Sequence, residues 1–224
     1  MTRSSISAQA PEQRGFGNRV ISRWPIAASS WIAMAFLVAF ALAAIVLVVF
    51  GAGNRGTSIA LRVTARWSFL LFWFAYVGGA MATLLGSHLS GWVRRRRELG
   101  LAFASALLVH VALVLWVIHI ATEPGGSMLF FWVGILCTYL LALFSVPLVR
   151  DALGPRLWRT FRTIAMEYIA LVFATDFILD PLQTHGLGKY PLTYLPFALM
   201  LVGGASLRVG AFARRRPLPN KIDA

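Results

Sequence analysis

Residues Arg94–His119 read RRRRELGLAFASALLVHVALVLWVIH, which is a cluster of arginines followed by an apolar run with one histidine in its middle and another at its end. From Leu99 to Thr122 there is no lysine, arginine or acidic residue. That interval exceeds the roughly 20 residues that a helix needs to cross the hydrocarbon core of a membrane. The stretch therefore predicts a transmembrane helix that starts beside a strongly basic cluster.

The remainder of the chain repeats this pattern. Of the 224 residues, 58% are hydrophobic and only 13% are charged, and the mean hydropathy is +0.73, which is typical of a membrane protein. The other long apolar intervals are Trp24–Asn54, Trp67–Val93, Pro124–Val149, Thr163–Leu182 and Tyr190–Val209. We therefore predict an all-α fold, an integral membrane bundle of six transmembrane helices.

The predicted bundle forms one domain, residues 24–212, between an N-terminal tail (1–23) and a basic C-terminal tail (213–224) that are too short and polar to bury a core. We expect the first apolar run to be retained as a helix, because it is longer than the roughly 7–15 residues of a signal peptide's apolar region.

Basic residues gather at alternate boundaries of the predicted helices. The positive-inside tendency places these boundaries, and both termini, on the cytoplasmic side of a bacterial inner membrane. Arg55, Arg62 and Arg66, in the predicted loop between the first two helices, would lie on the outer side against this tendency. The net charge of +13 then reflects topology and contact with anionic lipid headgroups, and we expect no nucleic-acid partner.

The two histidines of the opening stretch differ in depth and direction. His110 comes eleven residues after Leu99, about 16 Å into the helix, where an ionisable side chain faces the protein interior and is a functional candidate. A ligand role and a neutral, hydrogen-bonded core histidine are equally open for it. His119, nine residues further on, is about two and a half turns away and faces the opposite side near water, so we expect it to be structural.

Other motifs are few. Cys137 is the lone cysteine and has no neighbours with metal-ligand spacing, and no phosphate-binding or dinucleotide motif is present, so we expect no flavin or nicotinamide site in this chain. Close helix approach is indicated by glycines inside predicted helices: Gly78, Gly79, Gly134, Gly203 and Gly204. Glu167, one turn inside the cytoplasmic boundary, is interpreted as a structural partner of the basic segment before it.

Three short segments resemble one known family. Arg95–Ala104 (RRRELGLAFA) with His110, Thr64–Phe72 (TARWSFLLF), and Leu157–Arg162 with Met166–Phe173 (LWRTFR and MEYIALVF) are similar to the starts of three helices in bacterial ferric reductase-like transmembrane domains. These six-helix haem b proteins include the membrane subunit of the periplasmic methionine sulfoxide reductase system and are related to the membrane core of NADPH oxidases. The resemblance covers about residues 58–212.

The resemblance implies a haem b held by histidines of the third and fifth helices, which passes electrons across the bilayer. His110 matches the third-helix ligand and would bind haem iron. The fifth-helix ligand position holds Arg162, and the next expected histidine falls on Thr175 or Asp176. Arginine and threonine cannot replace imidazole on iron. His110 would then bind the haem alone or with an unusual second ligand such as Met166, Met34 or His88.

Charged residues near the outer side suggest a structural contact. Arg62 and Arg66 on one side, and Asp176 and Asp180 on the other, are each spaced i,i+4 at the same expected depth, which predicts interhelical ion pairs. Alternatively, Arg66 would receive a haem propionate or an anionic headgroup.

Three functions remain open from the sequence, and enzymatic activity is left undecided. The first is haem b-linked electron transfer, with a separate flavoprotein reductase or quinol as donor and a periplasmic acceptor. The second is a haem-free relative that serves as membrane scaffold, partner subunit or binder of quinone or another amphipathic ligand. The third is a transporter or proton-conducting protein that uses His119, Asp176, Asp180 and Arg66.

Overall fold

The computed structural model describes residues 26–86, 90–120, 128–184 and 190–215. The tail 1–23, His88 and residues 216–224 of the C-terminal tail lie outside the described residues. The helical elements are α1 (Ile26–Phe50), α2 (Asn54–Leu85), α3 (Ser90–Ile120), α4 (Met128–Phe144), α5 (Pro147–Leu153), α6 (Pro155–Ala174), the π-helical turn η2 (Thr175–Leu179), α7 (Asp180–Gln183) and α9 (Pro191–Arg215). The all-α prediction is confirmed.

Among the described residues, four helical segments are long and apolar enough to cross a membrane: Ser30–Phe50, Asn54–Leu85, Arg95–Ile120 and Pro191–Arg214. They support a multi-pass helical membrane protein embedded in a lipid bilayer. The two other expected crossings are occupied by α4, a shorter apolar helix, and by the continuous run of α6, η2 and α7, which carries acidic residues.

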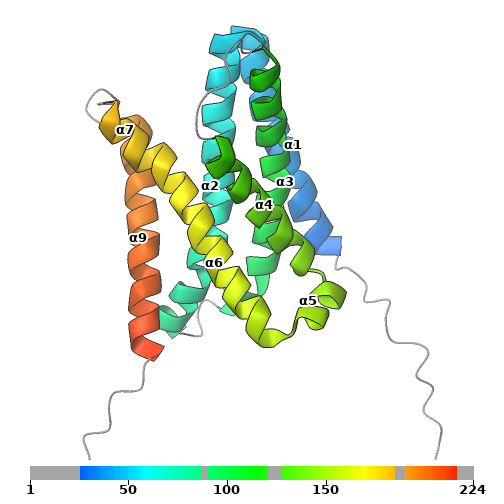
Figure 1. The fold of residues 1–224 in the computed structure, drawn as a ribbon, viewed down its shortest axis with the longest axis vertical. Coiled ribbons are helices and arrows are strands. Elements are labelled where there is room, and N and C mark those ends of the chain that lie inside the picture. Colours follow the sequence, from blue (N-terminus) through cyan, green and yellow to red (C-terminus); the bar gives the residue numbers. More distant parts are fainter. Residues whose placement is uncertain (1–25, 87–89, 121–127, 185–189, 216–224) are drawn as a thin grey trace, which may run out of the picture.

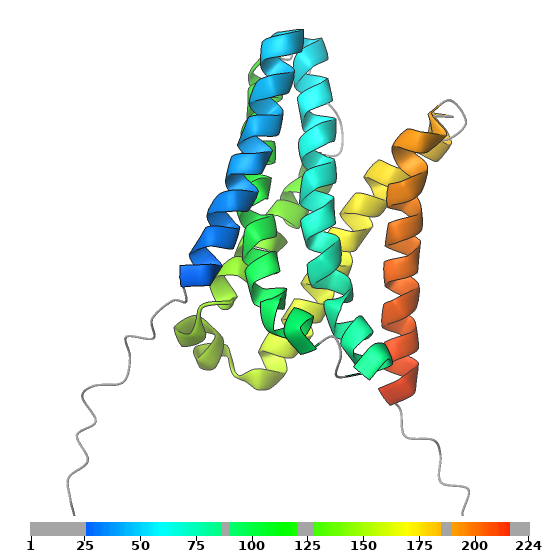
Figure 2. The same ribbon diagram turned by 180° about the vertical axis from the view of Figure 1, so that it is seen from behind.

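α2 lies between two sets of neighbours, α1 with α3 and, separately, α9 (Figures 1 and 2). α1, α2 and α3 pack side by side, and α9 lies against another side of α2. α6 packs on α4 and crosses the bundle obliquely toward the start of α9. α1 begins and α9 ends toward the same end of the bundle, at the bottom of both views.

Helix boundaries extend beyond the apolar intervals. α2 begins at Asn54 rather than at Trp67, so the prediction that Arg55, Arg62 and Arg66 lie in a loop was wrong: all three lie on the helix. Likewise α3 begins at Ser90 and α6 at Pro155, which places the adjoining arginines on helices. A charge marks the end of the apolar segment, whereas the helix continues wherever its backbone hydrogen bonds are satisfied.

Small residues bring α1 close to its neighbours. Ala35, Ala39 and Ala43, spaced four apart, are almost fully buried. At this contact Trp67 of α2 donates its indole N–H to the Ala35 carbonyl oxygen (3.1 Å), and Ser105 of α3 donates to the Ile32 carbonyl oxygen (2.9 Å). Large apolar side chains elsewhere on α1 are exposed, as expected for a surface that contacts lipid.

Aromatic rings fill the centre, where α2 meets α6 and η2. Phe69 of α2 lies edge-on to Phe173 and to Phe177, with ring centroids 5.1 Å apart in both pairs. Phe72 continues the cluster toward α3 through Phe103, at 5.4 Å. These buried rings fix how α6 crosses α2, and therefore which residues of α6 face the interior.

Glycines mark the closest contacts, as predicted for Gly134 and Gly204. A Cβ on Gly134 would lie 2.9 Å from a methyl group of Val172, and one on Gly204 would lie 3.0 Å from Trp73. At Gly78 and Gly79 the space is filled by the side chain of Arg96 rather than by a helix backbone. Gly203 has open space around it.

Candidate functional site

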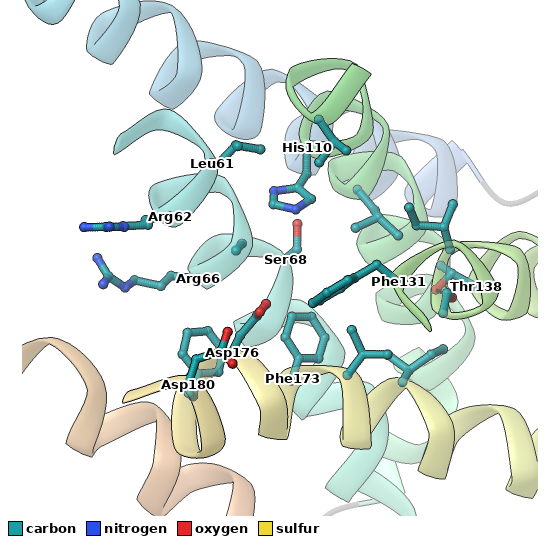
Figure 3. A pocket seen from close by; sticks show the side chains of 18 of the residues that line it. Leu61, Arg62, Arg66, Ser68, His110, Phe131, Thr138, Phe173, Asp176 and Asp180 are labelled. Carbon is teal, nitrogen blue, oxygen red and sulfur yellow. Dashed lines mark hydrogen bonds between the residues drawn. The ribbon is translucent and has the colours of Figure 1, made fainter. Parts of the chain in front are cut away.

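A cavity of about 540 Å³ lies at the centre of the bundle, between α2, α3, α4, α6 with η2, and α9 (Figure 3). This volume is within the range of roughly 300–1,000 Å³ that is usual for small-molecule and cofactor sites. Most lining side chains are apolar, including Phe131 and Phe173, and a few polar groups converge among them. Such a composition is characteristic of a site for an amphipathic ligand.

α3 contributes one continuous face of the cavity. Phe103, Leu107, His110, Val114 and Val117 line it, and their alternating spacing of four and three residues keeps them on one side of an α-helix. His119 is exposed and does not line the cavity; its ring lies beside Trp116, with centroids 6.0 Å apart. The structure thus places His110 inside and His119 outside, as their spacing predicts.

The ring of His110 is held in place by Thr64 of α2. The Nδ1 atom of His110 lies 3.0 Å from the Thr64 hydroxyl oxygen. That hydroxyl has a single proton, which it donates within its own helix toward the Ala60 carbonyl (2.9 Å) and the Leu61 carbonyl (3.2 Å). All three contacts are satisfied together when His110 Nδ1–H donates to Thr64, which leaves the lone pair on Nε2.

Besides its contact with Thr64, the His110 ring hydrogen-bonds the backbone of Leu61, also on α2, and the side chain lines the cavity (Figure 3). A hydrogen bond at one ring nitrogen that fixes the other is the usual arrangement of metal-ligating histidines. The same arrangement also suits a histidine that accepts a hydrogen bond from a ligand hydroxyl.

Arg62, Arg66, Asp176 and Asp180 all line this cavity, on the side shown at the left of Figure 3. The ion pairs predicted between them are not formed among the described residues; the ion pairs found there involve other side chains. Instead, the Arg66 guanidinium lies over the ring of Phe197, 5.7 Å from its centroid. The sequence spacing predicted a common depth for the four residues, but spacing alone does not determine whether their charged groups are in contact.

The π-helical turn η2 determines which residue of this segment enters the cavity. Asp176 and Phe177 line the cavity, whereas Thr175 does not and donates its hydroxyl to the Val172 carbonyl oxygen (2.6 Å). π-helical turns are rare and are frequent at functional sites. Of the two positions that the resemblance implied for a second histidine, only Asp176 reaches the cavity.

Two buried polar atoms at the cavity lack a hydrogen-bond partner among the described residues: Ser68 Oγ and Arg66 Nε. Figure 3 shows Ser68 directly below the His110 ring, pointing into the cavity. Buried polar atoms are nearly always satisfied, so an orphan that faces a cavity indicates a polar group of a ligand or water. Ser68 was not singled out from the sequence, because a serine in an apolar helix carries no distinguishing signal.

Among the described residues, no second histidine, cysteine or methionine lines the cavity. Met166 and Arg162 line a different cavity, and Met34 is exposed on α1. Within the described ranges no group of three or more His, Cys, Asp or Glu side chains could hold a metal ion. The residues therefore fit a haem held by one histidine, with apolar walls for the ring and Arg66 and Ser68 for its polar edge.

A separate polar network joins α2, α6 and α9. Glu167 pairs with Arg208 (2.7 Å) and accepts a hydrogen bond from the Tyr76 hydroxyl (2.7 Å), while the Arg208 guanidinium lies over the Tyr76 ring, 4.3 Å from its centroid. The structural role predicted for Glu167 agrees with this contact, but its partner is on α9 rather than in the basic segment before α6. Nothing in the sequence indicated which helix would face it.

No protein family, curated protein or solved structure matches this chain. The likeness to ferric reductase-like domains therefore rests on the short motifs alone.

Proposed function

We propose that this protein crosses the bacterial inner membrane six times, with both termini in the cytoplasm, and binds one b-type haem in the central cavity through His110 Nε2. The observation that carries the proposal is the His110–Thr64 contact, which directs an imidazole lone pair into a cavity of cofactor size. The motifs that resemble ferric reductase-like domains support the same assignment, and they include both residues.

When bound, a haem would supply one-electron redox chemistry, and the proposed role is electron transfer across the membrane. The protein's own residues position it. Thr64 fixes the orientation of the His110 ring, the aromatic and aliphatic walls exclude water, and Arg66 with Ser68 offers hydrogen bonds to a propionate. Electrons would come from a separate flavoprotein reductase or from quinol and pass to a periplasmic acceptor.

The second candidate is a haem-free protein whose cavity binds quinone or another amphipathic ligand. The observation that favours it is the single imidazole: no second histidine, cysteine or methionine lines the cavity among the described residues. Nε2 of His110 would then accept a hydrogen bond from the ligand.

Optical spectra of the detergent-purified protein distinguish the two candidates. We expect a b-type α band after reduction with dithionite, and we expect His110→Ala to abolish it. His119→Ala is the matched control, because it removes an imidazole from the same helix outside the cavity. With a single histidine ligand, the reduced haem should also bind carbon monoxide readily.

Two results would contradict the haem proposal. Protein produced with added haem precursor that shows no haem band would leave the quinone-type ligand as the remaining candidate. A bis-histidine spectrum that is insensitive to carbon monoxide would show that the ligation assigned to His110 alone is wrong.

A further inference from the structure

A second cavity, of about 290 Å³, lies between α2, α3, α4, α5 and α6. Phe103, Thr138 and Ile169 line both cavities, so they form the partition between them. The second cavity is on the side of this partition toward the starts of α3 and α6, which the proposed topology places in the cytoplasmic leaflet.

Four arginines from three helices line this cavity: Arg96 and Arg97 of α3, Arg150 of α5 and Arg162 of α6. Within the described ranges of the chain, no acidic side chain lines it. Arg150 also contacts the exposed carboxylate of Asp151 (3.3 Å), its neighbour in the sequence, outside the lining. Arg97, Arg150 and Arg162 are exposed side chains, and a bound anion would reduce the repulsion between the like charges that converge there.

The side chain of Arg96 packs against two glycines of the neighbouring helix α2. Its stem lies against Gly78 of α2 and its guanidinium against Gly79, where an added Cβ would crowd it, and its Nε–H donates to the Ala75 carbonyl oxygen (3.3 Å). The glycines thus hold one cation at the wall of the cavity. A solvated surface arginine needs no such accommodation.

Apart from Thr138 and Ser145, the remaining lining is apolar, and it includes Phe72, Leu141 and Met166. A cationic group of arginines beside apolar walls matches an amphiphile that has an anionic head and a hydrocarbon part. Basic pockets between transmembrane helices on the cytoplasmic side bind anionic lipid headgroups in this way. Arginine also matches phosphate geometrically, because its planar fork makes two parallel hydrogen bonds.

We propose that this second cavity binds the phosphate group of an anionic amphiphile from the cytoplasmic leaflet. Only the naming of the leaflet rests on the proposed topology; the anion site itself is independent of the haem assignment. Arg162 occupies the position where the family resemblance implied an iron ligand. Its guanidinium has no lone pair for a metal but can donate hydrogen bonds to an anion, so in this proposal Arg162 is an anion ligand.

The test is a thermal-unfolding titration of the purified full-length protein in a neutral detergent. Three ligands are compared: phosphatidylglycerol, zwitterionic phosphatidylcholine and inorganic phosphate. We expect saturable stabilisation by phosphatidylglycerol and little by phosphatidylcholine. Arg162→Gln should raise the half-saturating lipid concentration about tenfold, since one charge-assisted contact is lost.

Arg159→Gln is the matched control, because it removes the same charge one turn away on α6; both side chains are exposed, but only Arg162 lines the cavity. It should leave the titration unchanged. Arg150→Gln provides a second test from a different helix if Arg162→Gln fails to fold.

Three outcomes would overturn the proposal. Equal stabilisation by phosphatidylcholine would show that charge is not recognised. An equal loss in Arg159→Gln would show attraction to the general basic surface rather than a site. Stabilisation by inorganic phosphate alone, as strong as that by phosphatidylglycerol, would identify a soluble phosphate as the ligand and remove the amphiphile.

Discussion

The Nδ1 atom of His110 and the hydroxyl oxygen of Thr64 lie 3.0 Å apart and connect α3 to α2 at the wall of the central cavity. These residues are far apart in the sequence, and both occur in the segments that resemble ferric reductase-like domains. The contact fixes the ring at one nitrogen and presents the other to the cavity. Its effect on ligand binding can be separated from packing by substitution at Thr64.

Thr64→Val should keep the shape of the side chain but remove the acceptor for His110 Nδ1–H. If His110 binds haem iron, we expect the affinity for haem to fall roughly 10- to 100-fold, the usual cost of losing such a supporting hydrogen bond. Haem titration of the protein purified without haem, followed by absorbance, measures this change.

Thr138→Val is the control for that experiment. Thr138 also lines the cavity, but its hydroxyl donates to the Gly134 carbonyl oxygen of its own helix (3.0 Å). Its replacement should leave haem affinity nearly unchanged. An equal effect of the two substitutions would show that Thr64 does not act through the His110 ring.

Gly204→Ala should destabilise the bundle where α9 meets α2. The new methyl group would lie 3.0 Å from Trp73, whose indole N–H is already bonded to the Met200 carbonyl oxygen (2.6 Å). Overpacking of this kind costs roughly 1–3 kcal/mol. Gly203→Ala, the adjacent change into open space, should be neutral or slightly stabilising because alanine favours a helix. Thermal unfolding in detergent compares the two, and equal effects would contradict the packing described at Gly204.

Tyr76→Phe should weaken the network that joins α2, α6 and α9. The Tyr76 hydroxyl donates to the Glu167 carboxylate (2.7 Å), and its removal should lower the free energy of unfolding by about 1–2 kcal/mol. In a Glu167→Gln background the same change should cost less, since the charged acceptor is gone. A double-mutant cycle measures the difference.

Tyr168→Phe is the control for the cycle, because the Tyr168 hydroxyl donates to the Phe130 carbonyl oxygen (3.0 Å) and not to Glu167. Its cost should be the same in both backgrounds. Additive losses for Tyr76→Phe and Glu167→Gln would show that the two groups do not stabilise the bundle jointly.

Reporter fusions test the proposed orientation. A reporter that is active only outside the cytoplasm should be active after Ala121 and inactive after Ile222, because basic residues gather at the opposite boundaries and the number of crossings is even. A reporter that is active after Ile222 would refute six crossings.

The sequence by itself determined an all-α fold suited to a membrane, because its continuous apolar runs have the length of roughly 20 residues that a transmembrane helix needs, whereas a barrel strand takes only about 9–11. It also determined that His110 and His119 face opposite ways, since the angle between them is a property of the helix alone. The helix ends were less predictable. Arg62 and Arg66 looked like loop residues because a charge ends an apolar run without ending a helix.

Only the tertiary structure decided which side chains meet. The partner of His110 is Thr64, the partner of Glu167 is Arg208, and Arg66 lies over Phe197 instead of pairing with Asp176. Sequence spacing gives the depth and direction of a residue on its own helix. The rotation and tilt of each helix against its neighbours are set by side-chain packing between distant segments, such as the Phe69–Phe173 contact, and by local departures such as the π-helical turn at Asp176.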